Sequence, residues 1–168
     1  MKKTIILVVS WACVVLTMII IFCFSAQNRE ESRETSSGVI KDVLSIVMPE
    51  EEITTDVVKK YQFPFRKAAH FSIYMILGFA LANAFEYTLN KMWYFSYPCS
   101  VFVSALYAIS DEWHQGFSEG RGPSAFDVLI DTAGALFGVL FFAAFVYLYF
   151  RLTLKILVYR KNKRSIAE

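Results

Sequence analysis

At 168 residues the chain is long enough for one domain. Its apolar residues make up 56% of the total and come in long unbroken runs, which excludes an ordinary soluble core with polar residues between its elements. The net charge of +2 is too small to indicate a nucleic-acid-binding protein. We therefore expect an all-α, polytopic membrane protein that forms a single domain over residues 1–168.

The first predicted element is an apolar helix over residues 4–24, which follows Lys2 and Lys3. A run of about twenty apolar residues is long enough to cross a membrane and exceeds the core of a typical signal peptide, about 7–15 residues. We therefore predict a retained membrane span, with the two lysines on the cytoplasmic side.

Residues 25–67 form a polar and highly charged loop after this span. Within the loop, apolar residues recur at spacings of one, three and four: Val39, Ile40, Val43, Leu44, Ile46 and Val47. This pattern predicts an amphipathic helix that ends before Pro49. We expect the helix to lie along the outer membrane surface or over the mouth of the bundle. The alternative is a solvated linker that contains one helix.

Three further membrane spans are predicted, over residues 68–87, 93–113 and 126–150, which makes a bundle of four transmembrane helices. Pro64 lies just before the second span, where the entry to a helix tolerates proline. Small residues recur four positions apart in these spans: Gly78 and Ala82, then Ser100, Ser104 and Ala108, then Gly134 and Gly138. Such repeats favour close contact between membrane helices.

The basic residues predict how the bundle is oriented. Both the N-terminus and the tail over residues 151–168 are basic, and an even number of spans then places both termini in the cytoplasm. The turn at Lys91 is cytoplasmic in this arrangement, whereas the loop over residues 25–67 is outside. The start of the second span, with His70, consequently shares the outer face with the loop between the last two spans.

The densest group of ionisable residues lies from Asp111 to Asp131, around that last loop. Ionisable residues beside or inside an apolar span are costly, so such a group indicates function. Ser124 and Asp127 match a capping box, which explains Asp127 structurally, whereas Asp131 lies one turn deeper and has no such explanation. The candidate binding residues are Lys67, His70, Tyr74, Asp111, Glu112, Gln115, Arg121, Asp127 and Asp131.

Residue spacing excludes several chemistries. The Asp-Glu-Trp-His run at residues 111–114 lacks the HExxH spacing of a zinc site, and the chain has no phosphate-binding loop. The three cysteines show no CxxC spacing, so they predict neither disulfides nor a zinc finger. We expect no cofactor and no metal, with a divalent cation among the carboxylates as the less favoured alternative.

Several segments together resemble the VanZ-like family of membrane proteins. They are His70–Tyr74 (HFSIY), Tyr107–Gln115 (YAISDEWHQ), Gly120–Arg121, Asp127–Gly134 (DVLIDTAG) and Phe24–Gln27 (FSAQ) after the first span. The namesake of the family is an accessory protein linked to teicoplanin resistance. The resemblance implies a cell-envelope protein that lowers susceptibility to teicoplanin-type glycopeptides.

The interpretation that follows is a non-enzymatic protein with an outward-facing polar site. Its partners would be membrane lipids and either a lipid-linked cell-wall precursor or a glycopeptide, and Lys67, His70 and Arg121 would meet the anionic head group. One alternative is an intramembrane enzyme in which carboxylates and His70 perform acid–base chemistry on a lipid-linked substrate. A second alternative is a structural accessory protein whose ion pairs hold the helices together.

Overall fold

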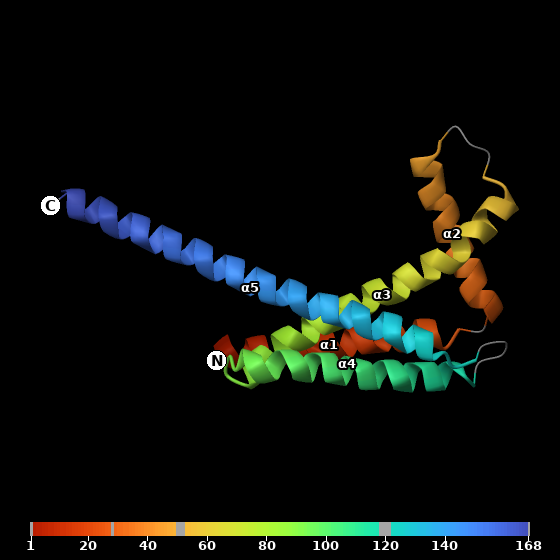
Figure 1. The fold of residues 1–168 in the computed structure, drawn as a ribbon, viewed down its shortest axis with the longest axis horizontal. Coiled ribbons are helices and arrows are strands. Elements are labelled where there is room, and N and C mark those ends of the chain that lie inside the picture. Colours follow the sequence, from red (N-terminus) through yellow and green to blue (C-terminus); the bar gives the residue numbers. More distant parts are fainter. Residues whose placement is uncertain (1, 28, 50–52, 118–121, 168) are drawn as a thin grey trace.

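The structure of the protein, a computed structural model, describes residues 2–27, 29–49, 53–117 and 122–167 (Figure 1). Within these ranges the chain forms five helices and no strand: α1 (Lys2–Ser25), α2 (Arg29–Val47), α3 (Thr55–Thr88), α4 (Trp93–Gln115) and α5 (Ala125–Ala167). The predicted all-α fold is confirmed. The last helix continues without interruption from the predicted fourth span into the basic tail.

Among the described residues, three helices are long and apolar enough to cross a membrane. They are α1 over Lys3–Ser25, α3 over Thr55–Thr88 and α5 over Ala125–Leu157. Helix α4 has 23 residues, so at 1.5 Å per residue it is about 35 Å long and matches the thickness of a bilayer core. It is not among the three, and its apolar residues are interrupted by serines and tyrosines. The molecule is therefore an all-helical membrane protein with three clearly apolar helices rather than the expected four.

The bundle is organised around close contact between α3 and α5. Gly134 and Gly138 of α5 lie so close to the backbone of Phe71 and Met75 that a Cβ at either glycine would collide with a carbonyl oxygen of α3. Gly78 of α3 lies equally close to the backbone of α5. This confirms the predicted small-residue contacts, because only residues without bulky side chains allow two helix backbones to approach so closely.

Helices α1 and α4 pack on α3 and on each other through small and polar residues. The predicted small-residue face of α4 is fully buried at Ser100, Ser104 and Ala108. The Tyr107 hydroxyl of α4 donates a hydrogen bond to the Met18 carbonyl of α1 at 2.7 Å. Polar contacts of this kind hold membrane helices together, because lipid removes the hydrophobic driving force for their association.

Helix α3 starts earlier than predicted. Its first residue is Thr55, so the expectation that Pro64 precedes the helix is wrong: Pro64 lies inside it. Proline removes one backbone hydrogen bond from a helix interior, and packing compensates, because the first turns of α3 bury Val58 against Ile40 and Leu44 of α2. Helix α2 is the predicted amphipathic helix, and it ends at Val47, two residues before Pro49, as expected.

The two ends of the bundle differ in what they carry. Helix α2 and the first turns of α3 stand at the end where α1 and α4 finish and α5 begins (Figure 1). At the opposite end, Lys3 donates a hydrogen bond to the Asn90 side chain in the turn between α3 and α4. The end that carries α2 is the one that holds the candidate site.

Candidate functional site

Polar side chains from three helices converge at the end of the bundle that carries α2. His70 of α3, Asp111 of α4 and Asp131 of α5 each place one ligand-type atom within 4.8 Å of the others. The distance from His70 Nδ1 to Asp131 Oδ1 is 3.6 Å. The contact between α3 and α5 produces this meeting, because Gly134, three residues after Asp131, lies against Phe71, the neighbour of His70.

The carboxylates of this cluster are shielded from solvent. Asp131 is 0% exposed and Asp111 is 4% exposed. Asp111 accepts a hydrogen bond from Gln115 Nε2 at 3.2 Å, and the Ser25 side chain at the end of α1 interacts with the same carboxylate. Four helices therefore contribute to the cluster. Sequence reasoning missed Ser25, although it lies in the Phe24–Gln27 segment that carried part of the family resemblance.

Tyr74 follows His70 by one helical turn and is fully buried. Its hydroxyl interacts electrostatically with Asp111 and Asp131 but has no hydrogen-bond partner among the described residues. The spacing of His70 and Tyr74 in the sequence predicted that they share a face of one helix. The structure places that shared face against the buried carboxylates.

Glu112 and Asp127 tie the end of α4, the start of α5 and the side of α3 together. Glu112 Oε2 accepts a hydrogen bond from the Ser124 backbone N–H at 2.8 Å. The Asp127 carboxylate instead forms an ion pair with Lys67 of α3, in which both side chains are 23% exposed. Only one of the two hydrogen bonds of the predicted capping box forms. It is the bond that the Asp127 backbone N–H donates to Ser124 Oγ at 3.4 Å. Glu112 takes the place expected for the Asp127 side chain, because Lys67 holds that side chain.

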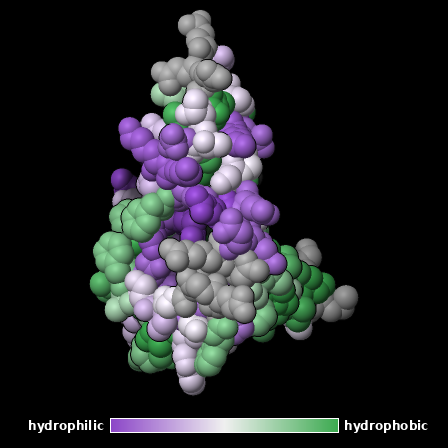
Figure 2. All heavy atoms as spheres, turned by 90° about the vertical axis from the view of Figure 1, so that its right-hand side faces the viewer, coloured by the Kyte–Doolittle hydropathy of each residue, from purple (hydrophilic) through white to green (hydrophobic). Residues whose placement is uncertain are grey.

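All the predicted binding residues except Arg121 thus meet at one end of the bundle. Arg121 and the neighbouring residues 118–120 lie outside the described residues. His114 does not join the cluster, because its ring packs against Phe22 of α1 with 4.6 Å between the ring centroids. Seen end-on, this part of the molecule gathers hydrophilic side chains around a recess, with apolar surface to the sides (Figure 2).

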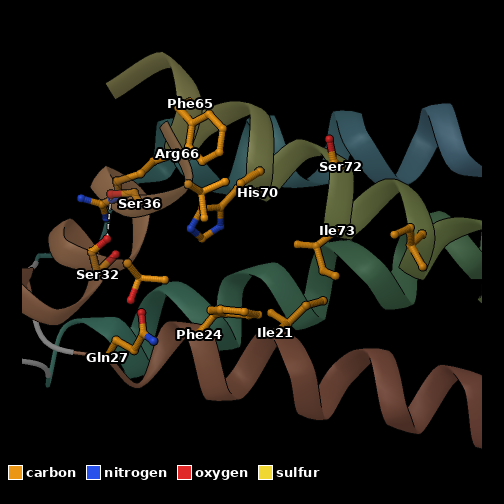
Figure 3. A pocket seen from close by; sticks show the side chains of 14 residues that line it. Ile21, Phe24, Gln27, Ser32, Ser36, Phe65, Arg66, His70, Ser72 and Ile73 are labelled. Atoms are coloured by element: carbon orange, nitrogen blue, oxygen red, sulfur yellow. Dashed lines mark hydrogen bonds between the residues drawn. The ribbon is translucent and has the colours of Figure 1, made fainter. Parts of the chain in front are cut away.

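An apolar groove of about 370 Å³ opens beside the cluster, between α1, α2 and α3 (Figure 3). Its apolar lining includes Ile21, Phe24, Val39, Phe65, Ile73 and Ile76. Most of its polar side chains gather at one end, namely Gln27, Ser32, Ser36, Arg66 and His70, whereas Ser72 lies toward the other end (Figure 3). The His70 ring extends from α3 into this space (Figure 3). The groove therefore offers a hydrocarbon-like wall next to a polar end.

A second space, which we call the basic cavity, has a volume of about 380 Å³ and lies between α2, α3 and the start of α5. Basic side chains dominate its lining: Arg33, Lys59, Arg66 and Lys67, together with Gln62, Phe63, His70 and Asp127. Arg66 and His70 line both spaces. The apolar groove and the basic cavity therefore meet at these two side chains. Sequence reasoning missed Arg33, Lys59 and Arg66, because charged residues in a polar loop carry no pattern that distinguishes a cavity from a solvated surface.

A family model described as VanZ/LLP1 matches residues 10–148. The chain belongs to the VanZ/LLP1 family. No curated protein and no solved structure matches the chain. The matched residues include the whole polar cluster, the apolar groove and the basic cavity. The resemblance seen in the sequence is thereby confirmed.

The geometry of this VanZ/LLP1 protein permits two kinds of chemistry. Arginine and lysine side chains bind phosphate and carboxylate groups through charge-assisted hydrogen bonds, so the basic cavity suits an anionic group. An imidazole next to buried carboxylates can accept and donate protons, so His70 with Asp131 also suits acid–base chemistry. Both kinds of chemistry require His70, which lies where the cluster, the groove and the basic cavity meet.

Proposed function

We propose that this VanZ/LLP1 protein binds an anionic amphiphile of the cell envelope and thereby lowers susceptibility to teicoplanin-type glycopeptides. The amphiphile is an anionic envelope lipid, a lipid-linked cell-wall precursor or the glycopeptide itself. The observation that carries this proposal is the meeting of the apolar groove and the basic cavity at Arg66 and His70. A hydrocarbon chain in the groove would leave its anionic head group beside the basic side chains.

Two physical effects favour an amphiphile over a fully soluble anion. Burial of hydrocarbon against the groove contributes about 0.8 kcal/mol for each CH₂ group removed from water. Arginine and lysine side chains in a partly enclosed cavity attract an anionic head group more strongly than the same side chains in open solvent. A ligand with only one of the two features would use only one of the two spaces.

In the proposed topology α4 also spans the membrane, which gives four spans in all, both termini are cytoplasmic and the two cavities open at the outer face. Three observations support it: the length of α4, the basic residues at both ends of the chain and the bond from Lys3 to Asn90. That bond places the start of α1 next to the turn at Lys91, at the end away from the cavities. The positive-inside rule then assigns that end to the cytoplasm.

The first test compares teicoplanin and vancomycin susceptibility of cells with and without the protein. Expression should raise the inhibitory concentration of teicoplanin more than that of vancomycin. The double variant Arg33→Ala/Lys59→Ala removes two charges from the basic cavity and should abolish this effect. The matched control Lys41→Ala/Lys60→Ala removes the same charge from exposed positions of α2 and α3 outside the cavity and should retain it. Equal behaviour of the two double variants would refute the proposed role of the cavity.

A second test measures binding directly. Purified protein in lipid nanodiscs should bind a fluorescent phosphatidylglycerol more tightly than the matching phosphatidylcholine, and added salt should reduce the difference. The Arg33→Ala/Lys59→Ala variant should bind both lipids alike. Preference for the neutral lipid in the wild type would exclude an anionic ligand.

A second candidate function is an intramembrane enzyme, which the closeness of His70 to Asp131 favours. Purified protein incubated with labelled envelope lipids would then show turnover that His70→Ala removes. The structural alternative makes a different prediction. If the ion pairs only hold the helices together, Glu112→Gln and Arg121→Ala would lower the amount of folded protein in membranes before they lower resistance. On the binding proposal, both variants are expressed normally and lose resistance.

A further inference from the structure

We propose that His70, Asp111 and Asp131 form a binding site for one divalent transition-metal ion, with Zn²⁺ as the preferred metal. This goes beyond the proposed binding of an amphiphile and does not depend on it. The sequence predicted no metal, because the three ligands lie on three different helices and none has a recognisable ligand spacing. Tertiary packing brings them together.

The first argument is geometric. One atom of each side chain lies within 4.8 Å of the other two, and His70 Nδ1 already lies 3.6 Å from Asp131 Oδ1. Around a tetrahedral Zn²⁺ with bonds of about 2.0–2.2 Å, neighbouring ligand atoms lie roughly 3.3–3.6 Å apart. Small side-chain rotations would therefore close the site without movement of the helices.

The second argument is the charge of the cluster. The carboxylates of Asp111, Glu112 and Asp131 are all at least 95% buried. Among the residues that the structure describes, the basic groups that act on Asp131 are His70 and Lys67, and the Asp127 carboxylate already engages Lys67. Buried carboxylates require a cation or several hydrogen bonds, because their removal from water is costly. A divalent cation at this point would supply the missing positive charge.

The third argument comes from buried polar atoms outside the three ligands. Tyr74 is fully buried and Glu112 is 3% exposed, and both interact electrostatically with Asp131. Within the described part of the chain, neither the Tyr74 hydroxyl nor Glu112 Oε1 has a hydrogen-bond partner. Buried polar atoms are rarely left unpaired in native proteins. Water bound to a metal in a fourth, open position would give both atoms a partner.

The donor set identifies the class of metal. Magnesium and calcium prefer oxygen ligands throughout, whereas an imidazole nitrogen favours zinc and other transition metals. No thiolate takes part, which argues against copper(I). One histidine, two carboxylates and an open position match the pattern of three protein ligands that catalytic zinc sites show. Gln115 would hold Asp111 in place through its hydrogen bond, as hydrogen-bonded neighbours commonly do for metal-ligating carboxylates, and Ser25 interacts with the same carboxylate.

The experiment uses the full chain purified in detergent without added chelator. Elemental analysis should find about one Zn²⁺ per chain, and protein stripped with a chelator should bind added Zn²⁺ in calorimetry more tightly than Ca²⁺ or Mg²⁺. X-ray absorption at the zinc edge should show nitrogen and oxygen ligands without sulfur. Zn²⁺ should also raise the unfolding temperature of the stripped protein, because a ligand that binds only the folded state stabilises it.

Two variants locate the ion. Asp131→Asn keeps the shape of the side chain and removes its charge, so it should weaken Zn²⁺ binding by roughly 100-fold or more, since loss of a neighbouring residue alone costs about 10- to 100-fold. The control is Glu86→Gln, which changes a carboxylate of α3 outside the cluster; one of its oxygens is also buried without a hydrogen-bond partner among the described residues. This control should bind like the wild type.

The proposal is overturned if stripped wild-type protein binds no Zn²⁺, binds Ca²⁺ or Mg²⁺ preferentially, or if Asp131→Asn binds Zn²⁺ as tightly as the wild type. Should Asp131→Asn fail to fold, the wild-type titration and the absorption spectrum still decide the matter. None of these readouts measures antibiotic susceptibility or lipid binding. The metal site and the proposed function can therefore fail independently.

Discussion

The contact between α3 and α5 can be tested by adding a single methyl group at Gly134. A Cβ at this position would lie 3.0 Å from the Phe71 carbonyl carbon and 3.1 Å from its Cα, and closer still to the carbonyl oxygen. Non-bonded carbon atoms normally lie about 3.5–4.0 Å apart, so the two helices would have to separate by roughly 1 Å. Gly134→Ala therefore disturbs the backbone contact that positions the polar cluster.

The size of the effect follows from this displacement. A gap of about 0.5–1 Å already loses a quarter to a half of the dispersion attraction between facing atoms. Overpacking of a close contact costs about 1–3 kcal/mol, and we expect Gly134→Ala to lower the free energy of unfolding by about 2 kcal/mol. The same separation would lengthen the distance from His70 to Asp131, so Zn²⁺ affinity should fall together with stability.

Gly38 provides the matched control. It lies within α2, and a Cβ there would meet nothing within 4 Å. Alanine is more favourable than glycine in a helix interior by about 0.8–1.0 kcal/mol, so Gly38→Ala should raise stability although it adds the same methyl group. The assay is unfolding of the purified protein in mixed micelles, followed by circular dichroism. The argument fails if Gly134→Ala is as stable as the wild type, or if both variants change stability by the same amount and sign.

Three further predictions concern contacts between the helices and the orientation of the chain. Asn83→Ala removes the hydrogen bond of 2.9 Å from the Asn83 side chain of α3 to the Ser10 hydroxyl of α1. The free energy of unfolding should fall by about 0.6 kcal/mol in the same assay, which is the average for polar contacts in membrane bundles. An unchanged free energy of unfolding would mean that the bond is not formed in micelles. A double-mutant cycle with Lys67→Ala and Asp127→Ala should give a coupling energy of about 1 kcal/mol between the two side chains, and added salt should reduce it. If the two substitutions change the free energy of unfolding strictly additively, the ion pair is contradicted. In a background without the native cysteines, a membrane-impermeant thiol reagent should label Gly122→Cys in intact cells and leave Lys91→Cys unlabelled; the reverse pattern would invert the proposed orientation.

Sequence reasoning predicted well the features that depend on local patterns. Apolar length predicted membrane helices, and periodic spacing with Pro49 predicted α2 and where it ends. Small residues four apart predicted the face of α4 at Ser100 and Ser104 and the contacts of Gly134. In each case a run of neighbouring residues contains the whole signal, because length, helical periodicity and side-chain size act within one helix.

Features that depend on distant residues were predicted less well. Pro64 was expected to precede a helix, but packing of Val58 on α2 carries α3 back to Thr55. The capping box was expected to hold Asp127, but Lys67 holds it and Glu112 caps the backbone instead. In both cases the local sequence favours one arrangement, but a residue that is distant in the sequence and close in the folded chain provides a stronger interaction.

The sequence by itself determined that the chain is a helical membrane protein of the VanZ type and that its ionisable residues gather near one loop. Only the tertiary structure decided which of these residues meet. His70, Asp111 and Asp131 come from three helices and are far apart in the sequence, and the glycine contact between α3 and α5 brings two of them together. The groove and the basic cavity likewise exist only because α2 packs on the first turns of α3, beside the end of α1 and the start of α5. A site built across helices requires their relative positions, and those depend on packing rather than on local sequence.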